Sequence, residues 1–192
     1  MKKHLIDFIE NIKTGKLEIY NEFSLQHELG IFLRNALPID YRIEFERNVS
    51  YFGIDGTDKK EIDIVVYKND NGKKMDKYAI ELKFPRNGQY PEQMYSFIKD
   101  IKFMEQLKDA GFKNTYCLTL VDDNKFYSNN KLKTDGIYGY FRNKEQISAK
   151  TKIKRPTGNT ENSIELDNNY TISWTEFENE KLKDWHYYWI EI

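Results

Sequence analysis

The chain has 192 residues, of which 39% are hydrophobic, 15% aromatic and 32% charged. This length supports one domain with a real core, and the hydrophobic content excludes intrinsic disorder for most of the chain. The formal net charge of −1 excludes a protein that coats nucleic acid by bulk electrostatic attraction.

Two further classes are excluded by the residue pattern. No window approaches the roughly 18 uninterrupted apolar residues that a membrane span needs, and Asp7 falls where a secretion signal would be apolar. We therefore expect a cytoplasmic protein with no membrane partner. The single Cys117 cannot form an intramolecular disulfide, and three scattered histidines do not supply a zinc cluster.

The first predicted elements are two amphipathic helices. Hydrophobic residues at helical spacing predict a helix over residues 3–12. A second helix is predicted to begin near Asn21 or Ser24, either of which can cap it, and to end before Pro38. Within this second helix, Glu28 places a carboxylate beside the apolar stripe.

Three strands, a long helix and a fourth strand are predicted next. Alternating apolar and charged residues predict a strand over 41–49, and β-branched runs predict strands over 61–67 and 78–84. A helix with one apolar side follows over 91–110, and an apolar strand over 115–121. The predicted order is therefore helix, three strands, helix, strand.

The last third of the sequence is less regular. Residues 124–159 are rich in Asn, Lys, Gly and Thr, which predicts a long loop with a short element over 137–141. Strands over 170–174 and 185–192 are predicted to extend the sheet or to cover one of its ends. No repeat or proline-rich linker divides the chain, so we expect a single domain over residues 1–192.

Four polar residues stand where packing alone would favour apolar side chains: Glu28, Asp63, Glu81 and Lys83. Side chains alternate along a strand, so Glu81 and Lys83 project from the same face. If the strand of Asp63 pairs with the strand of Glu81 through the turn between them, the two carboxylates lie close together.

This combination predicts phosphodiester hydrolysis. Two carboxylates in a partly buried site repel each other unless a cation joins them, and all-oxygen ligands suit Mg²⁺ or Mn²⁺. Such an ion polarises a phosphate and acidifies a bound water, while Lys83 can orient or deprotonate that water and offset charge in the transition state. Taken alone, Glu81 and Lys83 also fit a plain cross-strand salt-bridge face.

With these residues in this order, the chain resembles the PD-(D/E)xK nucleases, also called restriction-endonuclease-like. The resemblance covers about residues 21–121. It implies an α/β fold with an αβββαβ core, in which helices flank a mixed central sheet. Residues 122–192 would then form a C-terminal extension that adds further β structure.

The resemblance also implies roles for the four polar residues. Asp63 stands for the first acid of the family signature, Glu81 for the second and Lys83 for its lysine. Asp63, Glu81 and the helix-borne Glu28 would be the ligands of Mg²⁺ or Mn²⁺, and all four residues would be catalytic. One departure is that Ile62 replaces the proline of the signature.

Substrate contacts are predicted around the following helix. By analogy with family members that carry a glutamine early in this helix, Gln93 would help to position substrate; the alternative is a solvent-facing residue. Arg86 and Gln89, in the preceding link, are candidate phosphate contacts. Residues 125–155 hold nine basic and two acidic side chains, whereas residues 156–192 hold two basic and eight acidic ones. The basic stretch fits a phosphate-binding surface and equally a solvated loop.

The sequence therefore predicts a magnesium-dependent nuclease, with DNA as the expected nucleic acid and a role in restriction, defence or repair. The alternative is a catalytically inactive module that binds nucleic acid or protein on the same fold. A third reading is a defence component that cuts RNA. Sequence specificity would come from residues 124–159, from a homodimer or from a partner protein.

Overall fold

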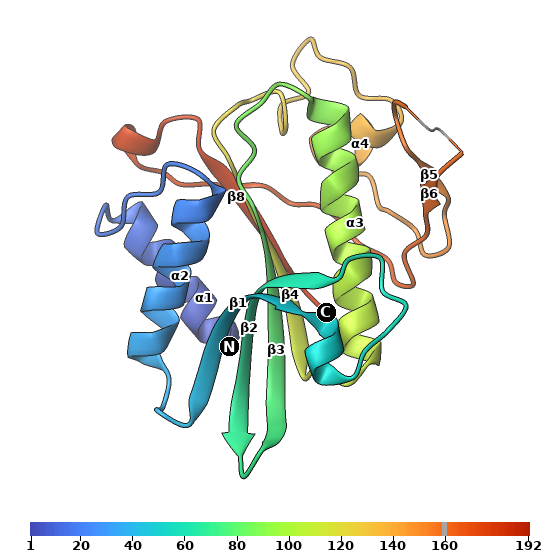
Figure 1. Ribbon diagram of the computed structural model, residues 1–192. Coiled ribbons are helices and arrows are strands. Elements are labelled where there is room, and N and C mark those ends of the chain that lie inside the picture. The colour runs from blue at the N-terminus through green and yellow to red at the C-terminus, as the bar shows by residue number, and fades with distance from the viewer. Residues whose placement is uncertain (159–160) are drawn as a thin grey trace.

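The computed structural model describes residues 1–158 and 161–192 (Figure 1). Its helices are α1 (Lys2–Lys13), α2 (Glu22–Ala36), α3 (Tyr90–Asp109) and α4 (Ile137–Arg142), with short 3₁₀ turns η1 (Val49–Phe52) and η2 (Glu180–Leu182). Its strands are β1 (Tyr41–Asn48), β2 (Glu61–Asp70), β3 (Lys73–Lys83), β4 (Asn114–Val121), β5 (Ile153–Lys154), β6 (Ser163–Ile164), β7 (Thr175–Glu176) and β8 (His186–Glu191).

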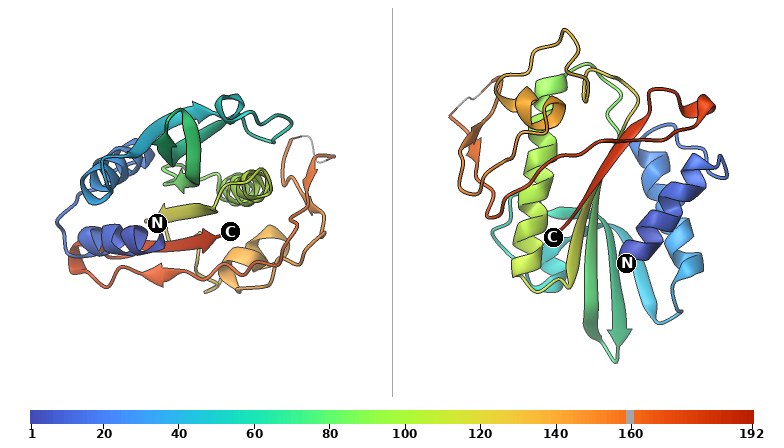
Figure 2. Two further views of the ribbon diagram at one scale, coloured as in Figure 1. Left: turned by 90° about the horizontal axis from the view of Figure 1, so that it is seen from below. Right: turned by 180° about the vertical axis from the view of Figure 1, so that it is seen from behind.

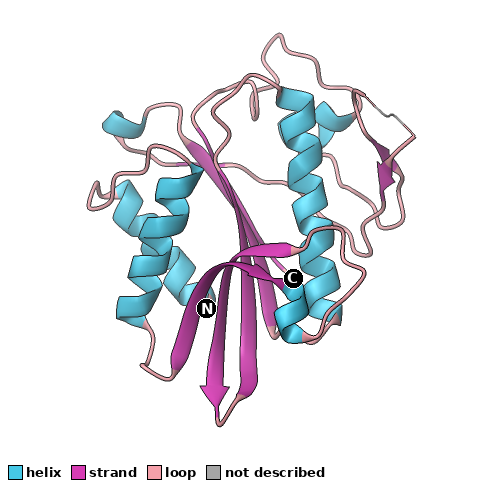
Figure 3. Ribbon diagram, in the orientation of Figure 1, coloured by secondary structure: helices cyan, strands magenta, loops and turns pink. Residues whose placement is uncertain are grey.

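The described residues form a mixed six-stranded sheet in the order β1-β2-β3-β4-β8-β7, which is the central layer in Figure 3. β3 and β4 pair in parallel, and the other neighbouring strands are antiparallel. Helices α1 and α2 cover one face of the sheet and α3 covers the other, as both views of Figure 2 show. The predicted α/β class, with a mixed sheet flanked by helices, is confirmed. A separate two-stranded ribbon, β5-β6, lies beside α3.

A capping box fixes the start of α2. The Asn21 side chain accepts a hydrogen bond from the Ser24 backbone N–H at 2.7 Å, and the Ser24 hydroxyl accepts one from the Asn21 N–H at 3.0 Å. Both predicted capping residues are therefore used. The helix ends at Ala36, since Pro38 cannot continue it. The cap matters for the site because the first turns of α2 carry Glu22 and Gln26.

A tight hairpin sets the register of β2 against β3. Asn71 and Gly72 both have positive φ (50° and 84°), which suits the two-residue turns that join antiparallel strands. In the resulting register Ile64 pairs with Ile80. Asp63 precedes Ile64 and Glu81 follows Ile80, one position further from the turn on each strand. The hairpin therefore brings Asp63 and Glu81 side by side.

The predictions for the last third were partly wrong. The short element at 137–141 is the helix α4, and the predicted strand at 185–192 is β8, which extends the sheet beside β4. Residues 170–174, however, form only an isolated bridge from Tyr170 to Ile147. This run packs its apolar residues onto α3 and α4 instead, since Ile172 is fully buried and the Trp174 indole N–H donates to the Phe141 carbonyl.

None of the helices in the described part of the chain combines the length and the apolar character that a membrane span requires. The core instead consists of two apolar clusters, one on each face of the sheet. The cluster under α3 is interrupted at one end of β2 and β3 by charged side chains, which form the site described next.

Candidate active site

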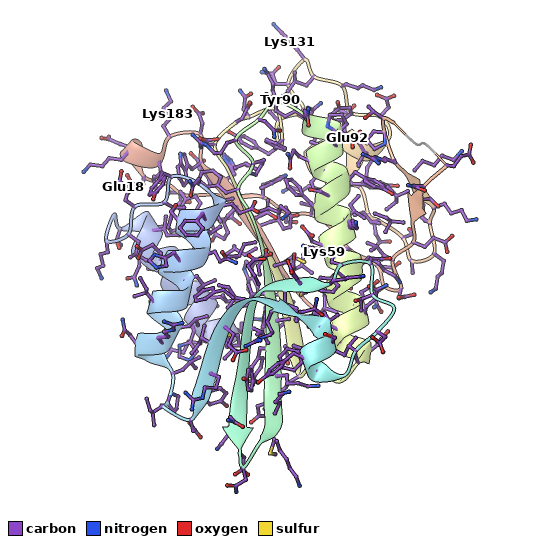
Figure 4. The ribbon with its side chains drawn as sticks, in the orientation of Figure 1. Glu18, Lys59, Tyr90, Glu92, Lys131 and Lys183 are labelled. Carbon is purple, nitrogen blue, oxygen red and sulfur yellow. The ribbon has the colours of Figure 1, made fainter. Side chains whose placement is uncertain are left out.

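Six charged side chains converge between the sheet, α3 and the start of α2, and we refer to them as the carboxylate–lysine cluster. Figure 4 labels one of them, Lys59, which lies between the strands and α3. The cluster consists of Glu22, Lys59, Asp63, Glu81, Lys83 and Asp100. It combines four carboxylates with two ammonium groups, so its net charge is −2 when every member is ionised.

Asp63 and Glu81 are joined across the two strands. The Asp63 backbone N–H donates to Glu81 Oε1 at 3.3 Å, and Asp63 Oδ2 accepts from the Leu82 N–H at 2.8 Å. Gln26 of α2 donates to the Asp63 carbonyl at 2.8 Å. Glu81 is only 1% exposed. The expected approach of the two carboxylates is therefore what the hairpin produces.

Lys83 lies on the same face as Glu81 and is held from two directions. Its Nζ is 3.5 Å from Glu22 Oε1 and 3.6 Å from Asp100 Oδ2, and it donates to the Leu82 carbonyl at 3.1 Å. Glu22 also accepts from the Phe84 N–H at 3.0 Å, which ties α2 to the end of β3. Lys83 is thus a fixed cation next to the two acids.

Burial and the mixture of charges shift the pKa values in the cluster. Burial raises the pKa of Asp63 to about 6, although the positive charges of Lys59 and Lys83 oppose this shift. Burial and the charges of Asp63 and Asp100 also raise the pKa of Glu81. For Lys83, burial favours a lower pKa, but Asp100, Glu22 and Asp63 outweigh it and the pKa is raised. Lys83 is therefore an ammonium group at neutral pH.

Because the pKa of Asp63 is raised, we expect the free energy of unfolding of the metal-free protein to depend on pH. Between the unfolded value of 3.8 and about 6, the folded state binds more protons than the unfolded state, so the free energy of unfolding falls as the pH rises. The loss is complete above the folded pKa and amounts to about 3 kcal/mol. Asp63→Asn removes this titration.

Urea unfolding of both proteins at pH 4, 5, 6 and 7 in the presence of a chelator checks this prediction. The stability advantage of Asp63→Asn over wild type should grow between pH 4 and pH 6 and then level off. An advantage that is the same at all four pH values would contradict the proposed titration of Asp63.

Glu28 is not part of the cluster. It lies six residues beyond Glu22 on α2, which is about 240° around the helix axis, and no hydrogen bond or ion pair among the described residues joins it to the other acids. The helix-borne acid beside Lys83 is Glu22 instead. A role for Glu28 stays a prediction that this cluster does not support, because spacing along a helix does not reveal which turn meets the strand ends.

Two of the three predicted substrate contacts share a hollow with Lys83 of the cluster. Gln93 and Arg86 border, together with Lys83, a hollow of about 430 Å³ that opens beside α2. Gln93 donates to Asn87 at 3.1 Å, and Arg86 is ion-paired with Asp122. Gln89 is exposed and precedes α3 without bordering this hollow.

Three cluster residues were not among the sequence predictions: Glu22, Lys59 and Asp100. Asp100 carried a usable signal, because it lies three residues after Phe97 and four before Met104, on the apolar side of α3. A charge on an apolar helix face needs a partner. Lys59 carried no such signal, since it stands in a polar loop next to another lysine, Lys60.

Part of the basic stretch over 125–155 is paired within the protein. Arg142 is buried and donates to the carbonyls of Lys125 and Lys133, so it is a structural residue. Further along, Lys150 pairs with Asp167, Lys152 with Glu165 at 3.7 Å and Arg155 with Glu92 at 3.5 Å. Several basic side chains of this stretch therefore meet acids of the tail and of α3.

A second hollow, of about 690 Å³, lies between α3 and the β5-β6 ribbon, away from Asp63 and Glu81. It is lined by charged residues that pair with one another, such as Arg155 with Glu92 and Lys102 with Asp167. Size alone does not make it the better site, because most of the charges that line it already have a partner of opposite sign. The carboxylate–lysine cluster instead retains a buried oxygen, Asp100 Oδ2, with no hydrogen-bond partner among the described residues.

The carboxylate groups of the cluster can be compared with the ligands that a divalent ion such as Mg²⁺ requires. In the described part of the chain, no three His, Cys, Asp or Glu side chains are arranged around one point as metal ligands. Mg²⁺, however, usually binds through one or two carboxylates and keeps several waters. Asp63 and Glu81 supply two carboxylates that lie next to each other, so they fit Mg²⁺ or Mn²⁺.

Comparisons of the chain with protein-family models, with curated proteins and with solved structures find no match. The geometry and charge of the carboxylate–lysine cluster are therefore the features that point to a function.

Proposed function

We propose that the protein is a metal-dependent nuclease that hydrolyses phosphodiester bonds, with DNA as its substrate. The observation that carries the proposal is the pairing of two acids on adjacent strands, the half-buried Asp63 and the buried Glu81, whose carboxylate accepts the Asp63 backbone N–H. The ammonium group of Lys83 lies beside them on the face of Glu81. A buried charged cluster of this kind costs folding free energy, which suggests a functional reason for it.

The order of elements supports the assignment of a restriction-endonuclease-like core. α2, β1, β2, β3, α3 and β4 follow one another in the αβββαβ order that the sequence resemblance implies, and β3 and β4 are parallel. On this assignment β2 carries the first signature acid and β3 carries the second acid and the lysine. The end of the C-terminal extension adds β7 and β8 to the sheet edge.

Asp63 and Glu81 would hold the divalent ion. When bound, such an ion would polarise the scissile phosphate and acidify an attacking water. The backbone contacts of Asp63 pre-organise this site, because the Leu82 N–H fixes one carboxylate oxygen and Gln26 fixes the carbonyl. Deprotonation of both acids favours ion binding, so binding should weaken below the pKa of Asp63, which is about 6.

Lys83 would stabilise negative charge on the phosphate in the transition state. Its raised pKa favours this role over that of a general base, because a base must give up its proton near neutral pH. Glu22 and Asp100 hold its Nζ from two sides, so Glu22 is a positioning residue in this scheme. Gln93 and Arg86, which border the same hollow as Lys83, are the candidate contacts for the neighbouring backbone phosphates.

Incubation with supercoiled, linear duplex and single-stranded DNA, and with RNA, tests the proposal. We expect cleavage of at least one DNA substrate in Mg²⁺ or Mn²⁺ and complete loss of cleavage in EDTA. Cleavage of RNA alone would change the substrate assignment. The absence of cleavage with all substrates and both ions would favour the non-catalytic binding module.

A further inference from the structure

A lysine that the sequence did not single out is built into the middle of the acidic cluster. Lys59 Nζ donates to Glu81 Oε2 and, at 2.9 Å, to Asp100 Oδ1. Its side chain is 23% exposed, whereas those of Glu81 and Asp100 are 0% and 5% exposed. The ammonium group therefore bridges two buried carboxylates that come from β3 and α3.

The backbone on both sides of Lys59 is tied to the rest of the fold. The Asp58 N–H donates to Gln106 of α3 at 2.9 Å, and the Lys60 carbonyl accepts from the Val49 N–H at 2.8 Å. The carbonyl of Lys59 itself accepts from the Thr57 hydroxyl at 2.6 Å. These contacts hold the short segment before β2 in place, so Lys59 is presented to the acids as a fixed cation.

The charge of the cluster limits how many further cations it can accept. Four carboxylates and the two lysines carry a net charge of −2 when all are ionised, and one divalent ion brings the total to zero. A second divalent ion would leave a charge of +2 in a site that is largely buried, which is costly. Without Lys59 the net charge would be −3, and Asp100 would lose the cation on its Oδ1 while its Oδ2 already lacks a hydrogen-bond partner.

We propose that the cluster binds a single divalent ion, at Asp63 and Glu81, and that the Lys59 ammonium group occupies the place between Glu81 and Asp100 that a second ion would otherwise fill. This inference rests on the proposed metal-dependent function. In two-metal sites the ions lie about 3.5–4 Å apart. The ammonium group of Lys59 would supply the positive charge of one of these ions permanently.

Counting Mn²⁺ ions bound to the full chain tests this proposal without any cleavage assay. Equilibrium dialysis should give one Mn²⁺ per wild-type chain, with the EPR spectrum of an isolated ion. Lys59→Met, which keeps an apolar stem beside Phe103, should bind two Mn²⁺ ions whose spin coupling broadens the spectrum. Lys60→Met is the matched control, because Lys60 is the exposed neighbour, and it should keep one ion.

The outcomes separate this inference from the proposed function. Two Mn²⁺ ions in wild type, or one ion in a folded Lys59→Met protein, would overturn the role of Lys59 and leave a metal-dependent nuclease intact. No Mn²⁺ in wild type would overturn both. If Lys59→Met does not fold, Lys59→Gln provides the second test, since its amide can still donate to Glu81 while lacking the charge, and it should also bind two ions.

Discussion

Asp63→Asn is expected to lower the rate of DNA cleavage by on the order of 10² to 10⁴-fold while the protein remains folded. An amide lacks the negative charge that a divalent ion needs, but its oxygen can still accept the hydrogen bond from the Leu82 N–H. Because burial already raises the pKa of Asp63, a neutral side chain at this position removes a cost from the folded state. Loss of activity should therefore occur without loss of stability.

Asp70→Asn is the matched control for this substitution. Asp70 is an exposed acid at the other end of β2, where its side chain accepts a hydrogen bond from Asn71. We expect its cleavage rate to stay within about twofold of wild type, as for most surface substitutions. Rates are measured at saturating Mg²⁺, and folding by circular dichroism. If the Asp63→Asn variant cleaves DNA at the wild-type rate, the proposed role of Asp63 as a metal ligand is wrong.

Glu105→Ala is expected to have the largest effect on stability, a loss of about 3–5 kcal/mol in the free energy of unfolding. Glu105 of α3 is 2% exposed. Its carboxylate accepts from the backbone N–H groups of Asp167 and Asn168, both at 2.8 Å, and from the Tyr170 hydroxyl at 3.0 Å. Alanine would leave a cavity where the buried carboxylate was, deprive these partly buried donors of their acceptor and detach the C-terminal segment from α3.

Urea unfolding with Asp109→Ala as the control measures this effect. Asp109 is the last residue of the same helix and is exposed, so its replacement should change the free energy of unfolding by at most about 0.5 kcal/mol. Glu105→Gln should give an intermediate loss, because the amide keeps one acceptor oxygen but brings an N–H group toward other donors. A loss below about 1 kcal/mol for Glu105→Ala would show that the C-terminal segment does not depend on this carboxylate.

Local rules in the sequence were enough to predict half of the site. The two-residue period of a strand placed Lys83 on the face of Glu81, and the turn at Asn71 and Gly72 allowed Asp63 to pair beside Glu81. These relations depend only on backbone geometry within one hairpin. The same local reasoning gave the caps of α2, the apolar side of α3 and the order of elements from α2 to β4.

The other half of the site was decided by tertiary packing. Glu22 rather than Glu28 meets Lys83, because the way α2 lies across the strand ends selects its first turn. Lys59 and Asp100 meet only when the loop before β2 packs under α3. Some basic side chains of the 125–155 stretch likewise pair with acids far away in the sequence, as Lys150 does with Asp167.

The sequence by itself therefore determined which residues share a strand face or a helix turn. Side chains repeat every two residues along a strand and every 3.6 residues along a helix, so these relations follow from residue spacing alone. Only the tertiary structure decided which charges from different elements come within reach of one another. That outcome depends on how α2, α3 and the loop of Lys59 pack against the sheet. This packing is set by the burial of side chains over the whole fold and not by any local period in the sequence.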